Sequence, residues 1–68
     1  MPRWYVSADG RQRLCFQGIT LVVTPAGSRF RWQAIRSGAP FAQGWAGYSW
    51  AAKQAAEAAG GIQSDETE

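Results

Sequence analysis

The feature that most constrains the fold is a series of turn signals at short intervals along the first two thirds of the chain. Asp9-Gly10 is a pair typical of a two-residue type I′ hairpin, and Gln17-Gly18 is a weaker version of it. Pro25–Ser28 and Ser37–Pro40 are four-residue turn sequences that combine proline with glycine. Because the segments between these turns are short, they favour strands joined by hairpins.

These segments predict an antiparallel β-meander with strands at about 3–7, 11–16, 19–24, 29–36 and 41–46. Directly opposed residues of an antiparallel pair point to the same face. The turn positions therefore predict a register in which Tyr5 opposes Leu14, Leu14 opposes Leu21, and Leu21 opposes Trp32. One face is then apolar and forms the expected core. Phe41 and Trp45 join this face if the last hairpin has an even loop.

The segment after the strands predicts one α-helix over about 50–59, with Ser49 as its N-cap and Gly60-Gly61 as its end. Alanines cover one broad side, which we expect to pack on the sheet: Ala51, Ala52, Ala55, Ala56, Ala58 and Ala59. The opposite stripe should be solvated and contains Lys53, Gln54 and Glu57. Trp50 shares the sector of this stripe, so it either folds over the sheet edge or is an exposed anchor.

The expected fold class is therefore α+β, with residues 1–62 as one domain and 63–68 as a flexible acidic tail. A chain of 68 residues buries only about 60% of the surface that its unfolded form exposes. Nine aromatic residues, four of them Trp, compensate in part because each ring buries a large area. An ordered but marginally stable domain follows.

One short helix can cover only one face of the sheet, so the other face should be open to solvent. The predicted register places basic and apolar side chains together on it: Trp4, Val6, Arg11, Arg13, Val22, Arg29, Arg31 and Ile35. Charge supports a basic surface. Residues 1–64 contain seven Lys/Arg against Asp9 and Glu57, or 7 − 2 = +5, and the last four residues add −3 through Asp65, Glu66 and Glu68.

Guanidinium groups pair with phosphate or carboxylate and stack on bases, so this face predicts binding to nucleic acid or to an acidic nucleoprotein surface. The candidate binding residues are Trp4, Arg11, Arg13, Arg29, Arg31 and Trp50. A protein interface, including a homodimer through the open face, is the alternative because Arg and Trp are enriched there too. An ordinary solvated strand surface would have a similar composition, since Arg stems cover apolar neighbours.

Other classes of function are disfavoured. With no His, the chain has no Cys/His zinc site and no obvious general base, and Cys15 has neither a disulfide partner nor a proton acceptor. We therefore expect no enzyme, no cofactor and no metal. The most apolar run, Ile19–Val23, is far shorter than the ~20 residues that span a bilayer. With no apolar segment after Arg3 to make a signal peptide, the expected location is cytoplasmic.

Two resemblances bear on function, and both concern architecture. Strands followed by one helix, with Ser49 opening it, are similar to the small arm-site DNA-binding domains of phage integrases. Small proteins with a compact sheet and one helix also resemble phage and mobile-element products, including inhibitors of host defence complexes. These resemblances imply either DNA binding or regulation of a host protein complex.

Overall fold

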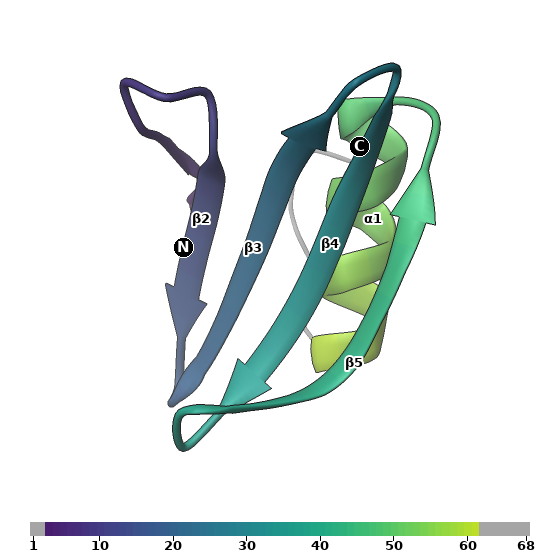
Figure 1. Ribbon diagram of the computed structural model, residues 1–68. Helices are drawn as coiled ribbons and strands as arrows, with labels where there is room; N and C mark the ends of the chain where they lie inside the picture. Colours follow the sequence, from purple (N-terminus) through teal and green to yellow (C-terminus); the bar gives the residue numbers. More distant parts are fainter. Residues whose placement is uncertain (1–2, 62–68) are drawn as a thin grey trace.

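The computed structural model describes residues 3–61, and over this range the chain forms a five-stranded antiparallel meander and one C-terminal helix (Figure 1). The strands follow one another across the sheet in chain order, and the expected α+β class is confirmed. The predicted tail, 63–68, lies outside the described residues. The elements are β1 (Tyr5–Val6), β2 (Gln12–Phe16), β3 (Ile19–Ala26), β4 (Arg29–Arg36), β5 (Ala39–Ala46) and α1 (Ser49–Gly60).

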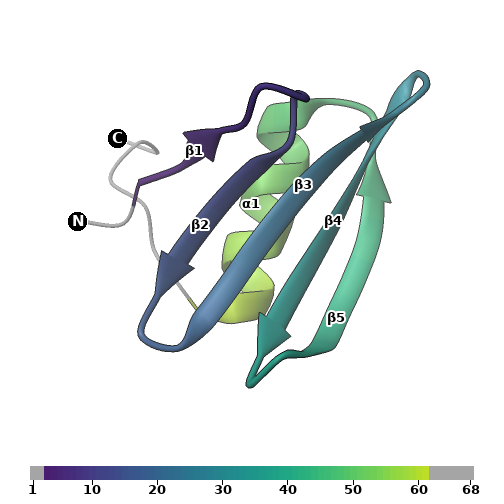
Figure 2. The same ribbon diagram turned by 60° about the vertical axis from the view of Figure 1, so that its left-hand side comes forward.

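The helix covers one side of the sheet, as Figure 2 shows with the strands in front and α1 behind them. It packs against β3, β4 and β5. Ala52 and Ala56 are fully buried, and because alanine is small they bring the helix axis close to the strands. The sheet supplies the bulk of the core through Leu14, Leu21, Val23 and Ala34, all at 0% exposure.

The Gln17-Gly18 hairpin is confirmed. Both residues have positive φ, at 50° and 81°, which is the requirement of a type I′ turn. Phe16 pairs with Ile19, and Leu14 with Leu21. The predicted four-residue turn at Pro25–Ser28 is wrong, because β3 continues to Ala26 and only Gly27-Ser28 turn.

This shorter turn moves the β3–β4 register by two residues. Leu21 pairs with Ala34 instead of Trp32, and Trp32 pairs with Val23. Side chains alternate with a period of two, so a shift of two leaves every residue on its predicted face. The arginines of β4 therefore stay on the side away from the helix, as expected.

The last hairpin departs from prediction in a way that changes a face. Its turn is Ser37-Gly38, and β5 begins at Ala39, opposite Arg36. Between the pairs Ile35–Pro40 and Ala34–Ala42 the register shifts by one, which leaves Phe41 as an extra, bulged residue. Beyond this bulge Trp45 pairs with Arg31. The expectation that Trp45 lies on the core face is therefore wrong.

Packing of Trp32 explains why the bulge is needed. The shifted register places Gly44 directly opposite Trp32, and the indole ring lies across this glycine. A Cβ at position 44 would be 2.9 Å from three atoms of the ring. Without the bulge, the residue opposite Trp32 would be Gln43, whose side chain has no room beneath the ring.

Replacement of Gly44 by alanine should therefore destabilise the fold. We expect Gly44→Ala to lower the free energy of unfolding by about 1–3 kcal/mol, because overpacking forces the ring or the strand to move. Urea unfolding followed by circular dichroism measures this change. Gly47→Ala is the matched control, since nothing lies within 4 Å of its added Cβ. Equal stability of the two variants would contradict the account of the bulge.

The first hairpin is also different from prediction. Tyr5 pairs with Arg13 and Val6 with Gln12, so five residues, Ser7–Arg11, form the connection. Hydrogen bonds close it, from Ser7 N to Arg11 O at 2.7 Å and from Gly10 N to Ser7 O at 3.0 Å. Gly10 has positive φ but Asp9 does not, so the predicted type I′ turn is wrong.

The resulting shift of one residue exchanges the faces of the N-terminal segment. Tyr5 now shares a face with Arg13, and Trp4 lies on the helix side. Trp4 is half-buried against the core, and its Nε1 donates to Glu57 Oε2 at 2.8 Å. The ammonium of Lys53 lies 5.9 Å from the centroid of the Trp4 ring.

These contacts correct the predicted helix as well. Glu57, expected in the solvated stripe, is buried at 6% exposure, and Ala58, expected on the sheet side, is exposed. The residue that caps the helix is Tyr48, with no side-chain cap hydrogen bond, and Ser49 is already helical. The end is as predicted: Gly61 adopts the left-handed conformation at φ 71°.

Candidate nucleic-acid interface

We call the side of the sheet away from α1 the open face. Strand pairing places the predicted arginines of β2 and β4 on it, together with aromatic and amide side chains from β1, β4 and β5. The centre of the face is half-buried by neighbouring side chains, at Val22 and Ile35 for example. Its charged, amide and aromatic members are Tyr5, Arg13, Arg29, Arg31, Gln33, Gln43 and Trp45.

Arg31 is positioned by a neutral partner. Its Nη2 donates to Gln43 Oε1 at 2.8 Å, and Gln33 Nε2 donates more weakly to the same oxygen at 3.4 Å. An amide oxygen orients the guanidinium but does not offset its charge. Arg31 therefore keeps a full positive charge and further N–H donors for an anionic ligand.

Trp45 lies beside Arg31 and is stacked by Arg29. The Arg29 guanidinium carbon is 4.9 Å from the centroid of the indole ring, within the range of a cation–π contact. Trp45 is 53% exposed although it is a large aromatic residue. A flat, solvent-accessible ring therefore lies at one edge of the sheet, beside the two arginines of β4.

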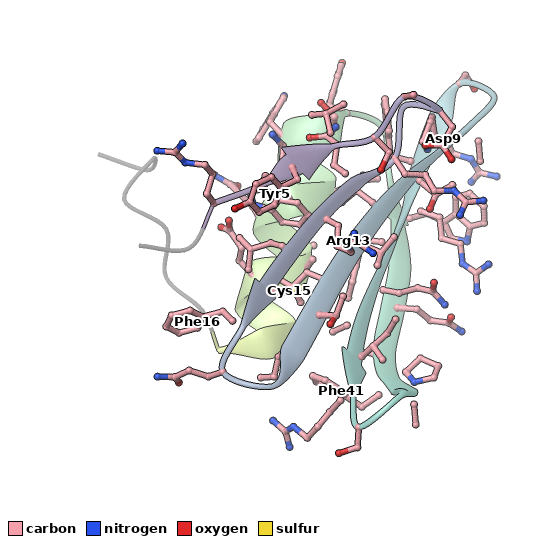
Figure 3. All side chains as sticks on the ribbon, turned by 90° about the vertical axis from the view of Figure 1, so that its left-hand side faces the viewer. Tyr5, Asp9, Arg13, Cys15, Phe16 and Phe41 are labelled. Carbon is pink, nitrogen blue, oxygen red and sulfur yellow. The ribbon has the colours of Figure 1, made fainter. Side chains whose placement is uncertain are left out.

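Arg13 and Tyr5 continue the surface toward the other edge. Arg13 pairs with Tyr5 on one side and Val22 on the other, so these three side chains form a row across three strands. Tyr5 is 67% exposed and Arg13 is exposed. Figure 3 shows Arg13 near the middle of the sheet, with Tyr5 on the edge strand beside it.

The open face is strongly basic because the acidic side chains lie elsewhere. In the described part of the chain these are Asp9, in the first loop, and Glu57, buried under Trp4. Among residues 3–61 the one ion pair is that of Arg11 Nε with Asp9 Oδ2, at 3.5 Å. The charges of Arg13, Arg29 and Arg31 are therefore free of a carboxylate partner within this range.

The six predicted binding residues do not all lie on one surface. Arg13, Arg29 and Arg31 lie on the open face as expected. Arg11 belongs to the Ser7–Arg11 loop and is engaged by Asp9, whose Oδ1 also accepts its backbone N–H at 3.1 Å. Its charge is thus largely offset.

The two predicted tryptophans lie elsewhere. The prediction that Trp4 lies on the open face is wrong, because its indole is bound to Glu57 on the helix side. Trp50, for which two positions were open, is 60% exposed in the first turn of α1. It stacks on Tyr48, with ring centroids 6.0 Å apart and an interplanar angle of 14°.

Sequence reasoning missed three members of the open face: Tyr5, Gln43 and Trp45. Tyr5 and Trp45 were assigned to the core because an alternating pattern was continued through a five-residue loop and a bulge. A readable signal for the bulge exists in Gly44, since a glycine inside a strand often marks a bulge or close approach of another group. The N-terminal loop has no comparable signal.

Three further observations on the described residues concern a thiol, metal ligands and membrane spans. Cys15 is exposed on the open face, and its Sγ lies 3.7 Å from Thr20 Oγ1. Residues 3–61 contain no group of three or more Cys, Asp and Glu side chains that could hold a metal ion. Over the same range, α1 is too short and too polar to cross a bilayer.

Comparison of the chain with protein families, curated proteins and solved structures finds no match.

Proposed function

We propose that the protein is a small, non-catalytic binding protein whose open face binds nucleic acid or an acidic nucleoprotein surface. The observation that carries the proposal is the cluster of Arg29, Arg31 and Trp45, in which Arg29 stacks on a half-exposed indole and Arg31 lies opposite it on the neighbouring strand. Arginine supplies charge and hydrogen bonds to phosphate, and an accessible ring supplies a stacking surface. The arginines and the indole can therefore contact both the phosphates and the bases of a nucleic acid.

Charge on the rest of the molecule supports this assignment. Lys/Arg residues outnumber Asp/Glu by seven to two within residues 1–64. The neutral hydrogen bond from Arg31 to Gln43 also fits a ligand site, because an ion pair there would compete with an incoming phosphate. The proposal includes a cytoplasmic location, where nucleic acid and nucleoprotein partners are found.

A non-catalytic role is proposed because the acidic side chains of the described region have other partners. Asp9 contacts Arg11, and Glu57 accepts from Trp4 beneath the surface. Neither carboxylate lies on the open face, so no proton acceptor of this kind stands beside the arginines. Cys15 is accessible, but its neighbour is the Thr20 hydroxyl.

A second candidate is a protein-interaction module, of the kind that phages and mobile elements encode to inhibit or regulate a host protein complex. The observation in its favour is the exposed stack of Tyr48 and Trp50, which lies away from the open face. Exposed aromatic residues are frequent anchors of protein interfaces. A homodimer through the open face belongs to the same class of function, and sedimentation measurements would detect it.

Titration of a fluorescent oligonucleotide at two salt concentrations tests the first proposal. Three phosphate contacts, by Arg13, Arg29 and Arg31, should give a slope of about −2 in log affinity against log salt, or about 20-fold weaker binding between roughly 50 and 200 mM. Fluorescence anisotropy provides the measurement. Absence of binding at the lower salt would reject nucleic acid as the partner and favour the protein-interaction module.

A further inference from the structure

The order of side chains across the open face contains more information than its net charge. From one edge of the sheet to the other, the pairing places Trp45 beside Arg31, then Thr24 and Val22 of the central strand, then Arg13 beside Tyr5. An exposed aromatic ring thus lies on each edge strand, and an arginine lies beside it on the next strand inward. Neighbouring strands are about 4.8 Å apart, so Trp45 and Tyr5 are separated by four spacings, or roughly 19 Å.

We propose that the ligand is a single strand of nucleic acid that crosses the sheet from β5 to β1. Its bases stack on Trp45 and Tyr5, and its backbone phosphates contact Arg31 and Arg13. This inference rests on the proposed function and specifies the ligand class of the same site. Trp45 is 53% exposed and Tyr5 is 67% exposed, so both rings can receive a base without rearrangement of the core.

Exposed rings favour single strands over duplexes for a physical reason. In a duplex, the faces of the bases are already stacked on one another, and a protein reaches only their edges. Single strands present whole base faces, which stack on aromatic side chains with little regard to sequence. The Arg29–Trp45 stack, at 4.9 Å, holds the indole in place for such a contact.

The shape of the molecule also disfavours a duplex. The major groove is about 12 Å wide and admits one helix or a two-stranded ribbon. The five-stranded open face is wider than this, at roughly 19 Å across the strand axes. The helix lies behind the sheet, and its single basic residue, Lys53, lies 5.9 Å from the Trp4 ring.

The test compares a labelled single strand of about 12 nucleotides, within the range of single-strand sites on small domains, with a duplex of the same sequence. At low salt the wild-type protein should bind the single strand at least about 10-fold more tightly. Trp45→Leu should weaken single-strand binding by about 10-fold, since stacking of one base contributes about that much. Trp45→Phe should retain most of the affinity because it keeps a ring.

Trp50→Leu is the matched control, because it removes an equally exposed indole that is not on the open face; its affinity should stay within about twofold of wild type. Duplex binding as tight as single-strand binding, or wild-type affinity in Trp45→Leu, would overturn the inference and leave the proposed function standing. Failure to bind either oligonucleotide at low salt would instead reject the proposed function. If Trp45→Leu does not fold, the inference is tested by the affinities of the wild-type protein for the single strand and for the duplex.

Discussion

Replacement of Arg13 and Arg31 together by alanine should reduce the affinity for an oligonucleotide on the order of 100-fold at low salt. Hydrogen bonds that involve a charged group contribute about 1.5–3 kcal/mol each, and both side chains lack a carboxylate partner among residues 3–61. Loss of two phosphate contacts should also make the salt slope shallower by about 1.4 on a single strand. Anisotropy titrations at several salt concentrations measure both quantities.

The control for this variant is Arg36→Ala with Lys53→Ala, which removes the same charge from the helix side of the molecule. Lys53 belongs to α1, and Arg36 pairs with Ile19 on the side of the sheet that faces the helix. Its guanidinium lies 5.0 Å from the Phe41 ring, so it resembles Arg29 in its local contact. An equal loss of affinity in the two double variants would mean that net charge, rather than the open face, is what binds.

Trp4→Ala should lower the free energy of unfolding by about 3 kcal/mol. Truncation of a fully buried Trp costs about 3–5 kcal/mol, and Trp4 is half-buried, so packing contributes less than this range. The variant also leaves Glu57, 6% exposed, without its hydrogen-bond donor, which adds about 1–3 kcal/mol. For a small domain this is a large share of the total stability.

Urea unfolding measures the effect. Trp50→Ala is the control, because it makes the same substitution at an exposed position. Trp50 is 60% exposed, so its removal should change stability by less than about 0.5 kcal/mol. Trp4→Ala combined with Glu57→Leu should recover part of the loss, because an apolar side chain needs no donor. Similar stability of the two tryptophan variants would contradict the assignment of Trp4 to the helix side.

The sequence predicted the element order and most of the core because these depend on local signals. Gln17-Gly18 specified its hairpin directly, since both residues must adopt positive φ in a two-residue loop. The buried positions Leu14 and Leu21 were correct, although the β3–β4 register was wrong by two. A shift of two residues leaves face assignments unchanged.

Two shifts of strand register by one residue were not predicted, and they account for the errors in the candidate site. The five-residue first loop turned Trp4 toward the helix, and the bulge at Phe41 turned Trp45 toward the arginines. A period of two makes every face assignment sensitive to one inserted residue. Both events depend on tertiary contacts, those of Trp4 with Glu57 and of Trp32 with Gly44, which involve residues far apart along the chain or across the sheet.

The central claim, that the Arg- and Trp45-bearing open face is the binding surface, is tested most directly by the indole N–H signals in a nitrogen-15 NMR titration with a single-stranded oligonucleotide. The protein has four tryptophans in distinct environments, so each reports on its own region. The Trp45 signal should move progressively, while Trp4, bound to Glu57, and Trp50, at the start of α1, should stay in place. Movement of the Trp50 signal with a stationary Trp45 signal would contradict the claim.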